Sequence, residues 1–587
     1  MDVATRGLAT MNMFLHNNDQ AVIKQGNTLA KPFFTKKDGS LKTFDFAVAN
    51  PPFSSKAWST GFDAYHDEYK RFEGIGVPPA KNGDYAFLLH LIKSLNSIGK
   101  GAIILPHGVL FRGNTEAKIR KNLIKRGYIK GIISLPANLF FGTGIPACII
   151  VIDKEDAASR KDIFMIDASK GYIKDGNKNR FREQDIHKIV NVFNNQSEIP
   201  KYSRMVPTSE IADPKNDYNL NIPRYIDSQE EEDLQDIEAH LLGGIPAKDV
   251  EDLEAFWTVC PTLKDTLFAP NERSGYYTLK VDKANIKSAI LENPDFIDYS
   301  KKLYDAFHGW KKEAKPLLDN LNSASKPKEV IVDISEKLLS AFENNPLLDK
   351  YDVYQRLMDY WSETMQDDVY LIASNGWKIE IDIIKNKKGK ETGWKCDLIP
   401  KNIVTYKYFQ KEKEEIEKLI EKSENFVQQM ETLDEENSGE DDLFSEVRND
   451  SNKISRTEIK KRIREIRGNS EFADELKILQ EYSNLAEHEA EIKSKIKDAE
   501  ANLDTKLRIK YNALPGDEVK TLVVESKWLK TLFDFVTSEM ERVAHKLTRR
   551  IKELAERYEA PLPKLTQNVE ELSKNVDNHL KNMGFKW

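Results

Sequence analysis

The sequence predicts a doubly wound α/β domain at the N-terminal end, followed by a mostly α-helical region. Helical patterns at Tyr85–Leu95 and Thr115–Lys125 alternate with short runs that are apolar throughout. Such runs are typical of strands that are buried on both faces of a largely parallel sheet. The alternation therefore favours a doubly wound (Rossmann-like) sheet. Its strands are expected at FDFAVAN (44–50), GAIILP (101–106), GIISLP (131–136) and ACIIVI (147–152).

The length of 587 residues is too great for one hydrophobic core, and shifts in pattern predict several domains. Residues 1–226 include the α/β pattern and a loop-rich tail. Residues 227–401 form a helical or mixed extension with many aromatic residues. A long helical hairpin or coiled coil is expected over 402–510, and a C-terminal helical region over 511–587.

The hairpin is predicted from two long amphipathic patterns, over 402–433 and 472–510, in which apolar residues advance in steps of three, four and seven. Glu489 interrupts the second stripe. An antiparallel coiled coil and a pair of amphipathic helices that pack on their own domain fit this spacing equally well. The acidic segment DEENSGEDD (434–442) between them should be a solvated loop, and a further helical region is expected over 527–581.

Composition excludes several classes of protein. The net charge is −7, which is not the profile of a protein whose whole surface binds nucleic acid. Contact with DNA would have to come from a local basic patch or from a partner. The basic run KKRIREIR (460–467) is better explained as a solvated helix face. No pattern for a P-loop or a Ser-His-Asp triad is present, so the chain shows no sign of a motor or a nuclease.

Cysteine usage and hydropathy predict a cytoplasmic protein without a metal site. Cys148, Cys260 and Cys396 lie far apart and form no pair with the spacing of a zinc or redox motif. Unpaired thiols are typical of a reducing compartment. No apolar run reaches the length of a membrane span, and the N-terminus lacks the pattern of a signal peptide.

The strongest chemical signal is the tetrapeptide Asn50–Phe53, which directly follows a predicted strand. Ligands of open α/β sheets bind beyond the carboxyl ends of the strands. The amide oxygen of Asn50 and the carbonyl of Pro51 are two hydrogen-bond acceptors, and Pro52 keeps the segment stiff without adding a donor. Phe53 offers a flat face on which a base can stack, a contact worth roughly 1–3 kcal/mol.

These groups suit an exocyclic amine on a purine. Such an amine is a poor nucleophile, so a catalyst must hold the base outside the duplex and accept hydrogen bonds from the amine. A simple turn also explains Asn-Pro-Pro after a strand. His107, at the end of another predicted strand, is expected to be a satisfied loop histidine rather than a catalytic one. The glycines of FGTGIPA (141–147) are expected to form a hairpin-like turn.

The surrounding blocks resemble one family. DFAVANPPFS resembles the catalytic loop of N6-adenine DNA methyltransferases, and further blocks follow in the order seen in the modification subunit of type I restriction–modification systems. Two C-terminal segments resemble the longer members of that family. The blocks are NGDYAFLLH (82–90), GAIILPHGVLFR (101–112), ISLPANLFFGTGIPACIIVI (133–152), LPGDEVKTLVVESKWL (514–529) and NMGFKW (582–587).

The resemblance implies an S-adenosyl-L-methionine-dependent, adenine-specific DNA methyltransferase (EC 2.1.1.72) that acts on a flipped adenine in double-stranded DNA. Asn50, Pro51, Pro52 and Phe53 would form the adenine site. The C-terminal helices would dock on the coiled-coil spacers of a separate DNA-specificity subunit, which would choose the target sequence. A second modification subunit and a restriction–translocase subunit are further partners that the resemblance implies.

The sequence also departs from the family pattern. The glycine-rich turn that cradles S-adenosylmethionine, and the acidic residue that holds its ribose, are not found upstream of Asn50. Gly26-Asn27-Thr28-Leu29 is similar to the Gly-Asp-Thr-Leu block beside the cofactor adenine, which makes Asn27 and Leu29 cofactor-binding candidates. The chain is thus expected to be N-terminally truncated relative to the family, with an incomplete sheet and exposed apolar edges. The alternative function is a non-catalytic remnant that acts only as an assembly partner of the specificity subunit.

We expect the 587-residue chain by itself to bind S-adenosyl-L-methionine weakly or not at all, because the helix terminus that would hold the cofactor carboxylate is missing. Isothermal titration calorimetry with the isolated chain tests this expectation. Binding with a micromolar Kd would contradict it.

Overall fold

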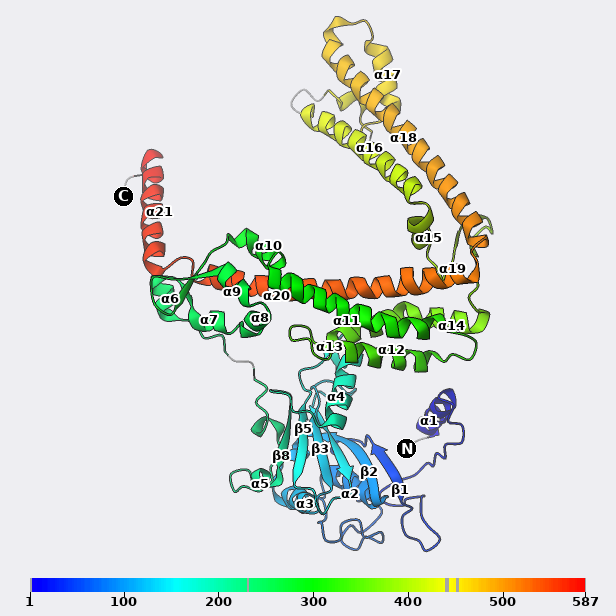
Figure 1. Cartoon of the computed structure of the whole chain (residues 1–587), viewed down its shortest axis with the longest axis vertical. Helices are drawn as coiled ribbons and strands as arrows, with labels where there is room; N and C mark the ends of the chain where they lie inside the picture. Colours follow the sequence, from blue (N-terminus) through cyan, green and yellow to red (C-terminus); the bar gives the residue numbers. More distant parts are fainter. Residues whose placement is uncertain (1–2, 230–231, 439–442, 450–452, 586–587) are drawn as a thin grey trace. The chain divides into compact units, whose positions relative to one another are not determined.

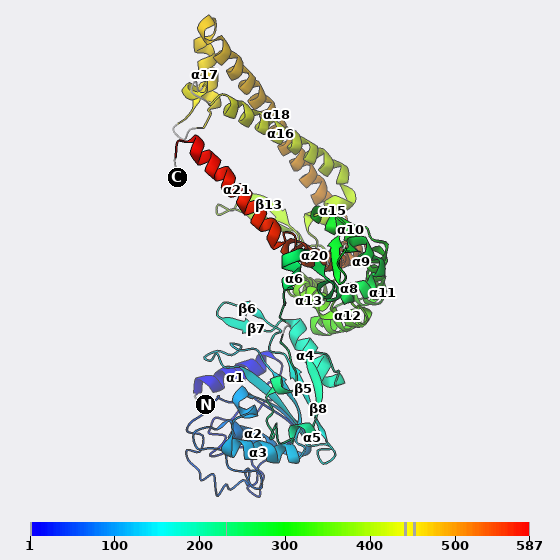
Figure 2. The same cartoon turned by 90° about the vertical axis from the view of Figure 1, so that its left-hand side faces the viewer.

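A computed structural model describes residues 3–229, 232–438, 443–449 and 453–585. The chain divides into two compact units, residues 1–237 and 238–587. Figure 1 and Figure 2 show the mixed sheet of the first unit and the long helices of the second. None of the described helices is both long enough and apolar enough to cross a bilayer.

Within its described residues, the first unit is built on a six-stranded mixed sheet in the order β1-β2-β4-β3-β5-β8. The fold is therefore α/β, as predicted. The predicted strands are present, although the second is longer than expected and begins at Leu95. The strands are β1 (Phe44–Ala49), β2 (Leu95–Pro106), β3 (Ile129–Ser134), β4 (Ala147–Asp153), β5 (Asp162–Asp167) and β8 (Ser203–Pro207).

The strand directions correct one expectation. β1, β2, β3 and β5 run in the same direction, whereas β4 and β8 run opposite to their neighbours. The sheet is thus mixed rather than largely parallel. The apolar run at β4 is a buried strand, but it is antiparallel because the loop that joins it to β3 contains no helix. Parallel strands need a long crossover connection, whereas a short loop reverses the chain.

Helices cover both faces of the sheet. α2 and α3 share one apolar core with β2, β3, β4 and β5, and α4 packs on the opposite face against Phe164 and Ile166. Gly127 ends the turn after α3, where a Cβ would lie 1.9 Å from the carbonyl oxygen of Ala157, so only glycine fits. The helices and the small hairpin of this unit are α1 (Val3–Leu15), α2 (Asp84–Lys93), α3 (Asn114–Lys125), α4 (Glu183–Asn195), α5 (Thr208–Ile211), β6 (Ile173–Asp175) and β7 (Lys178–Arg180).

β1 forms one edge of this sheet. On one side of the strand, Phe46 and Val48 are 75% and 83% exposed, while Ala47 packs against the core on the other side. The expected apolar exposure is therefore present at this edge. α1 likewise has no buried residue among those described.

The second unit is mainly helical, with a core that draws on residues 239–404 and 507–558. Its first helices and small sheet are α6 (Ile237–Leu242), β9 (Ile245–Pro246), α7 (Ala247–Glu251), α8 (Glu254–Val259), α9 (Pro261–Leu267), β10 (Phe268–Pro270), β11 (Tyr276–Leu279) and α10 (Ile286–Leu291). The larger elements are α11 (Pro294–Asp319), α12 (Pro327–Ala341), α13 (Lys350–Tyr360), α14 (Gln366–Asn375), β12 (Asp382–Lys385), β13 (Glu391–Lys395) and α15 (Lys401–Tyr408). They continue with α16 (Gln410–Glu436), α17 (Arg456–Ile466), α18 (Ala473–Asn512), α19 (Gly516–Thr521), α20 (Lys530–Arg557) and α21 (Leu562–Asn582).

The two long helices α16 and α18 pack along each other, so the predicted hairpin is present (Figure 1). The first predicted helix is interrupted at Phe409. α16 then continues to Glu436, so residues 434–436 are helical and not part of a loop as expected. The guanidinium of Arg448 lies 2.5 Å from Asp434 and offsets the acidic end of this helix. Residues 439–442 of the acidic segment lie outside the described residues.

The Glu489 interruption of the stripe on α18 has a structural explanation. Its side chain is buried and ion-paired with Arg456 of α17, at 2.5 Å, and with Lys493 one turn along α18. Burial raises the pKa of Glu489, but the two cations outweigh it, so the carboxyl pKa lies below its usual range. An acidic residue in an apolar stripe thus fixes the small helix α17 to the hairpin.

The last predicted helix divides into two. α20 ends at Arg557 and α21 begins at Leu562, because Pro561 and Pro563 cannot continue a helix from the preceding turn. α21 has no buried residue among those described. Its exposed apolar residues repeat at alternating steps of three and four, followed by one of seven: Leu562, Leu565, Val569, Leu572, Val576 and Met583.

A buried ion pair holds the second unit together near its two π-helical turns, Trp361–Met365 and Leu522–Leu529. The ammonium of Lys527 lies 2.7 Å from Asp368 and also donates to the carbonyl of Leu398 at 2.8 Å. Trp528 donates to the same carboxylate at 2.8 Å. Burial raises the pKa of Asp368 against the opposing effect of Lys527. The pair joins α14, the segment after β13 and the turn before α20.

We predict that Lys527→Met lowers the free energy of unfolding by about 3–5 kcal/mol, because it leaves the Asp368 carboxylate buried without its cation. The double variant Lys527→Met/Asp368→Asn should recover much of this loss. Urea unfolding followed by tryptophan fluorescence measures both. Lys315→Met, which removes a half-exposed pair with Asp319, is the control and should cost no more than about 1 kcal/mol. Equal stability of Lys527→Met and the wild type would contradict the prediction.

Candidate active site

The carboxyl ends of the strands that run in the same direction meet at one edge of the sheet. β1 pairs in parallel with β2, and β2 and β3 both flank the antiparallel strand β4. The chain leaves these strands at Asn50, His107 and Leu135. The strand-end residues selected from the sequence thus lie along one edge, as expected for an open α/β sheet.

The tetrapeptide Asn50–Phe53 leaves β1 in an irregular loop. The side chain of Asn50 is exposed and forms no hydrogen bond with any residue that the structure describes. Pro51 is half-buried and Pro52 is exposed. The amide of Asn50 therefore keeps both its acceptor and its donors available at the strand end.

Phe53 is held by a second aromatic ring that the sequence analysis did not select. The ring of Phe140 lies 5.7 Å from that of Phe53, at an interplanar angle of 77°, an edge-to-face pair worth about 0.5–1.5 kcal/mol beyond its buried area. Phe140 belongs to the loop between β3 and β4. The signal available in the sequence was the position of Phe140 in the loop after β3, a strand whose carboxyl end meets the same edge.

The loop that contains Phe140 is held by the small hairpin β6–β7. The backbone N–H of Asn179 donates to the carbonyl of Asn138 at 3.0 Å, and its side-chain amide donates to Ala137 at 2.6 Å. Lys178 donates to the carbonyls of Phe140, at 2.8 Å, and Thr143, at 3.1 Å. Four hydrogen bonds from one hairpin thus fix the backbone on both sides of the Phe140 ring.

Asp84, at the first turn of α2, anchors the exit of the tetrapeptide loop. Its buried carboxylate accepts the backbone N–H of Ser54 at 2.7 Å and lies 3.0 Å from the guanidinium of Arg112. Ser54 adopts a φ of +50°, a left-handed conformation that costs energy unless contacts such as this one hold it. Arg112 also contacts Glu116 at 3.4 Å, and burial raises the pKa of that second carboxyl.

His107 is engaged in its own loop, as expected from the sequence. Its Nε2 atom lies 3.0 Å from the hydroxyl of Ser134, which joins the end of β2 to the end of β3. Burial lowers the pKa of His107, so the imidazole is neutral near pH 7. The contact positions two strand ends relative to each other.

The cofactor-binding candidates make other contacts. Asn27 Oδ1 accepts the backbone N–H groups of Leu29 and Ala30, each at 3.1 Å, and so caps a local turn. Leu29 is buried in the core beside α2, and its carbonyl accepts Arg71 at 2.8 Å. The oxygen that would replace the family carboxylate is thus already hydrogen-bonded. These two residues do not by themselves form a site for S-adenosylmethionine.

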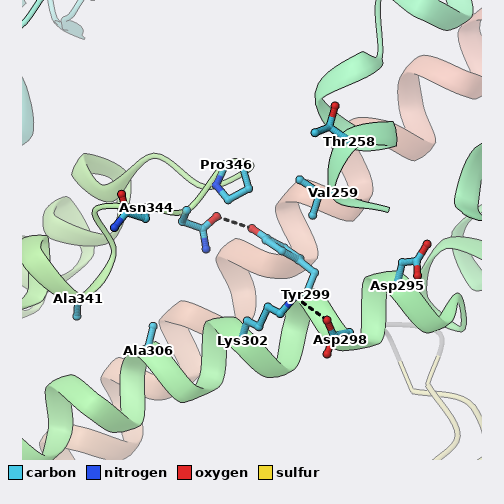
Figure 3. A pocket seen from close by; sticks show the side chains of 11 residues that line it. Thr258, Val259, Asp295, Asp298, Tyr299, Lys302, Ala306, Ala341, Asn344 and Pro346 are labelled. Atoms are coloured by element: carbon cyan, nitrogen blue, oxygen red, sulfur yellow. Dashed lines mark hydrogen bonds and ion pairs between the residues drawn. The ribbon is translucent and has the colours of Figure 1, made fainter. Parts of the chain in front are cut away.

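The second unit contains a surface cavity of about 500 Å³ (Figure 3). Its polar groups are paired with one another: Tyr299 donates to Asn345 at 2.8 Å, and Lys302 lies 2.7 Å from Asp298. Asp295 accepts the hydroxyl of Thr262 at 2.7 Å. The cavity therefore offers a ligand no unpaired charge at these positions.

Comparison with known proteins concerns the first unit of the chain. Residues 1–234 match the model of the family described as N-6 DNA Methylase. The matched region, residues 1–234, is thus similar to the N-6 DNA Methylase family and to methylase subunits of type I restriction enzymes.

The relatives are similar over the same region. The MpnII methylase subunit of Mycoplasma pneumoniae is 32% identical over 239 residues, which are 40% of this chain and 43% of that protein. The MjaVII methylase subunit of Methanocaldococcus jannaschii is 32% identical over 252 residues, 40% of this chain and 41% of that protein. The chain thus spans about two-fifths of the length of these relatives. A type I methyltransferase subunit from Streptococcus thermophilus of known structure is 39% identical, with a TM-score of 0.35, over 38% of this chain and 47% of that one.

We predict a graded effect at Asp84. Asp84→Ala removes the acceptor for Ser54 and leaves Arg112 without its buried partner, so the free energy of unfolding should fall by about 3–5 kcal/mol. Asp84→Asn keeps an acceptor oxygen for Ser54 and should cost clearly less. Urea unfolding of both variants tests the order, with the exposed Asp45→Ala as control. An equal loss for the two variants would show that the hydrogen bond to Ser54 contributes nothing.

Proposed function

We propose that the protein is the modification subunit of a type I restriction–modification complex, which methylates the N6 amine of adenine in double-stranded DNA. The observation that carries the proposal is the exposed Asn50 amide at the strand end, which forms no hydrogen bond with a described residue and lies three residues before Phe53. The match of residues 1–234 to the N-6 DNA Methylase family supports it.

In the proposed reaction, the target adenine leaves the duplex and stacks on Phe53. The Oδ1 atom of Asn50 and the carbonyl of Pro51 accept the two hydrogens of the amine. Because both acceptors hold the amine hydrogens, the nitrogen lone pair is less delocalised into the purine ring and can attack the methyl group. S-adenosyl-L-methionine supplies the methyl group.

The remaining residues hold the proposed adenine site in place. Pro52 keeps the loop stiff and adds no donor that would compete for the amine. Phe140 packs its edge against Phe53, and Asp84 holds the backbone at Ser54. A base of unusual pKa is not required, since the attacking group is a neutral amine and the methylated nitrogen can then lose its proton to solvent water.

The proposal includes a DNA-specificity subunit as partner. α21 presents a heptad-like apolar stripe that is not covered by any described residue, which is the surface that a coiled-coil partner needs. A net charge of −7 agrees with target choice by another subunit. Residues 586–587 of the terminal NMGFKW segment lie outside the described residues. A second modification subunit, a restriction–translocase subunit and a cytoplasmic location complete the proposed assembly.

A second function, that of a non-catalytic assembly partner, is favoured by one observation. The oxygen of Asn27 is occupied by backbone amides, whereas α21 is free to dock. In that case the wild-type complex would assemble with the specificity subunit but transfer no methyl groups.

Asn50→Ala should reduce methyl transfer by at least about 100-fold, which is typical for removal of one polar group aimed at a transition state. The measurement is incorporation of tritiated methyl groups into plasmid DNA by the chain reconstituted with its specificity subunit. Asn50→Asp keeps the acceptor oxygens and should retain part of the activity. Unchanged incorporation of methyl groups by Asn50→Ala would contradict the adenine-site proposal. An inactive wild-type complex would favour the assembly role.

A further inference from the structure

The hairpin β12–β13 of the second unit presents a cluster of lysines at its turn. Four of the six residues in KNKKGK (385–390) are lysines, and all six residues are exposed. None of the four ammonium groups has an acidic partner among the residues that the structure describes. The turn is therefore a concentrated, uncompensated positive charge on a chain whose net charge is −7.

The backbone of this turn is ordered by Asn386. Its side-chain oxygen accepts the N–H groups of Lys388, at 2.9 Å, and Lys390, at 3.0 Å. Its backbone pairs with Lys390 at 2.9 Å and with Gly389 at 2.8 Å, and Gly389 supplies the positive φ of +77° that the turn requires. The lysines thus project from a fixed backbone, which lowers the entropy lost on binding.

The base of the hairpin is anchored to α18. Trp394 of β13 is buried, donates to Asp504 at 2.8 Å and packs against Tyr511 with 5.0 Å between ring centroids. Glu391, at the start of the same strand, lies 3.0 Å from Arg508. The hairpin therefore has a rigid base and a solvent-exposed, cationic end.

The basic helix α17 shows the contrasting arrangement. Arg456 pairs with Glu489, Lys460 with Glu487 at 2.8 Å, and Arg462 with Glu475 at 2.8 Å. These three cations are already paired with carboxylates of the same unit. A polyanion would therefore gain less from these three cations than from the unpaired lysines of the hairpin turn.

We propose that the β12–β13 hairpin is a binding surface for the phosphate backbone of duplex DNA. A two-stranded β-ribbon fits the major groove, whose width is about 12 Å, and lysines on its turn can reach phosphates on either side. The half-exposed Ile383 and Ile384 on the stem provide apolar contact for the groove edge. The assignment of DNA, rather than another polyanion, as the ligand rests on the proposed function. The presence of the cationic surface is independent of that function.

The test compares two charge-matched variants of the full chain. Lys385, Lys387, Lys388 and Lys390 are all changed to Gln in the first. The control changes four exposed lysines of α16 and α18 to Gln, namely Lys418, Lys422, Lys495 and Lys497. Both variants lose the same charge, and neither set is part of the core. Binding of a fluorescein-labelled 30-base-pair duplex is measured by anisotropy between 50 and 200 mM NaCl.

The hairpin variant should bind the duplex at least about tenfold more weakly at 50 mM NaCl. The slope of log K against log [NaCl] should become shallower by about 0.9 for each lost phosphate contact. The control should keep the slope and affinity of the wild type. A hairpin variant with the wild-type slope, or a wild-type chain that does not bind the duplex at 50 mM NaCl, would overturn the proposal.

Two further measurements separate this surface from the proposed function and from other partners. Duplex binding by the chain requires no methyl transfer, so a wild-type chain that binds DNA through the hairpin but transfers no methyl groups contradicts only the adenine site. A hairpin variant that loses binding to a matched RNA duplex, or to vesicles containing phosphatidylserine, but still binds DNA normally would identify another polyanion and overturn the DNA assignment.

Discussion

The contact between the Asp84 carboxylate and the loop after β1 is the constraint on which the candidate site depends. A single buried side chain accepts the backbone N–H of Ser54 and pairs with Arg112, and so ties the tetrapeptide loop to α2 and to the segment after β2. Without it, the left-handed backbone at Ser54 would have no compensation, and Phe53 would lose its fixed position against Phe140. The proposed adenine site needs such rigidity, because displacements of about 1 Å impair catalysis strongly.

In the second unit, buried charged side chains also hold separate elements together. The Lys527–Asp368 pair is a costly pair of charges in an apolar core, yet each partner also has further hydrogen bonds to satisfy it. Glu489 has the same role in the helical hairpin, where Arg456 and Lys493 neutralise it. In both places, buried charge specifies which elements pack together. Apolar stripes alone would permit several registers.

Electrostatics also distinguishes three surfaces within the second unit. An acidic chain repels DNA at long range, so its contacts must be local. The four lysines of the 385–390 turn have no acidic partner among the described residues and are held on an ordered turn, whereas Arg456, Lys460 and Arg462 of α17 are ion-paired. The apolar stripe of α21 has no partner among the described residues and suits a helical subunit. The proposed assembly thus places protein contacts and DNA contacts on different elements.

The sequence by itself determined the α/β class, the strand positions and the adenine-site hypothesis at Asn50–Phe53, because apolar runs and strand-end residues are local features. It also predicted the paired long helices from their spacing. Tertiary structure decided the antiparallel direction of β4, the pairing of Phe140 with Phe53 and the role of Asp84, since each depends on residues far apart in the chain. It likewise decided that Asn27 caps a local turn, and that the lysines of 385–390 remain unpaired while those of α17 do not. A linear pattern specifies which side chains are available, but only the folded chain determines which of them are already satisfied.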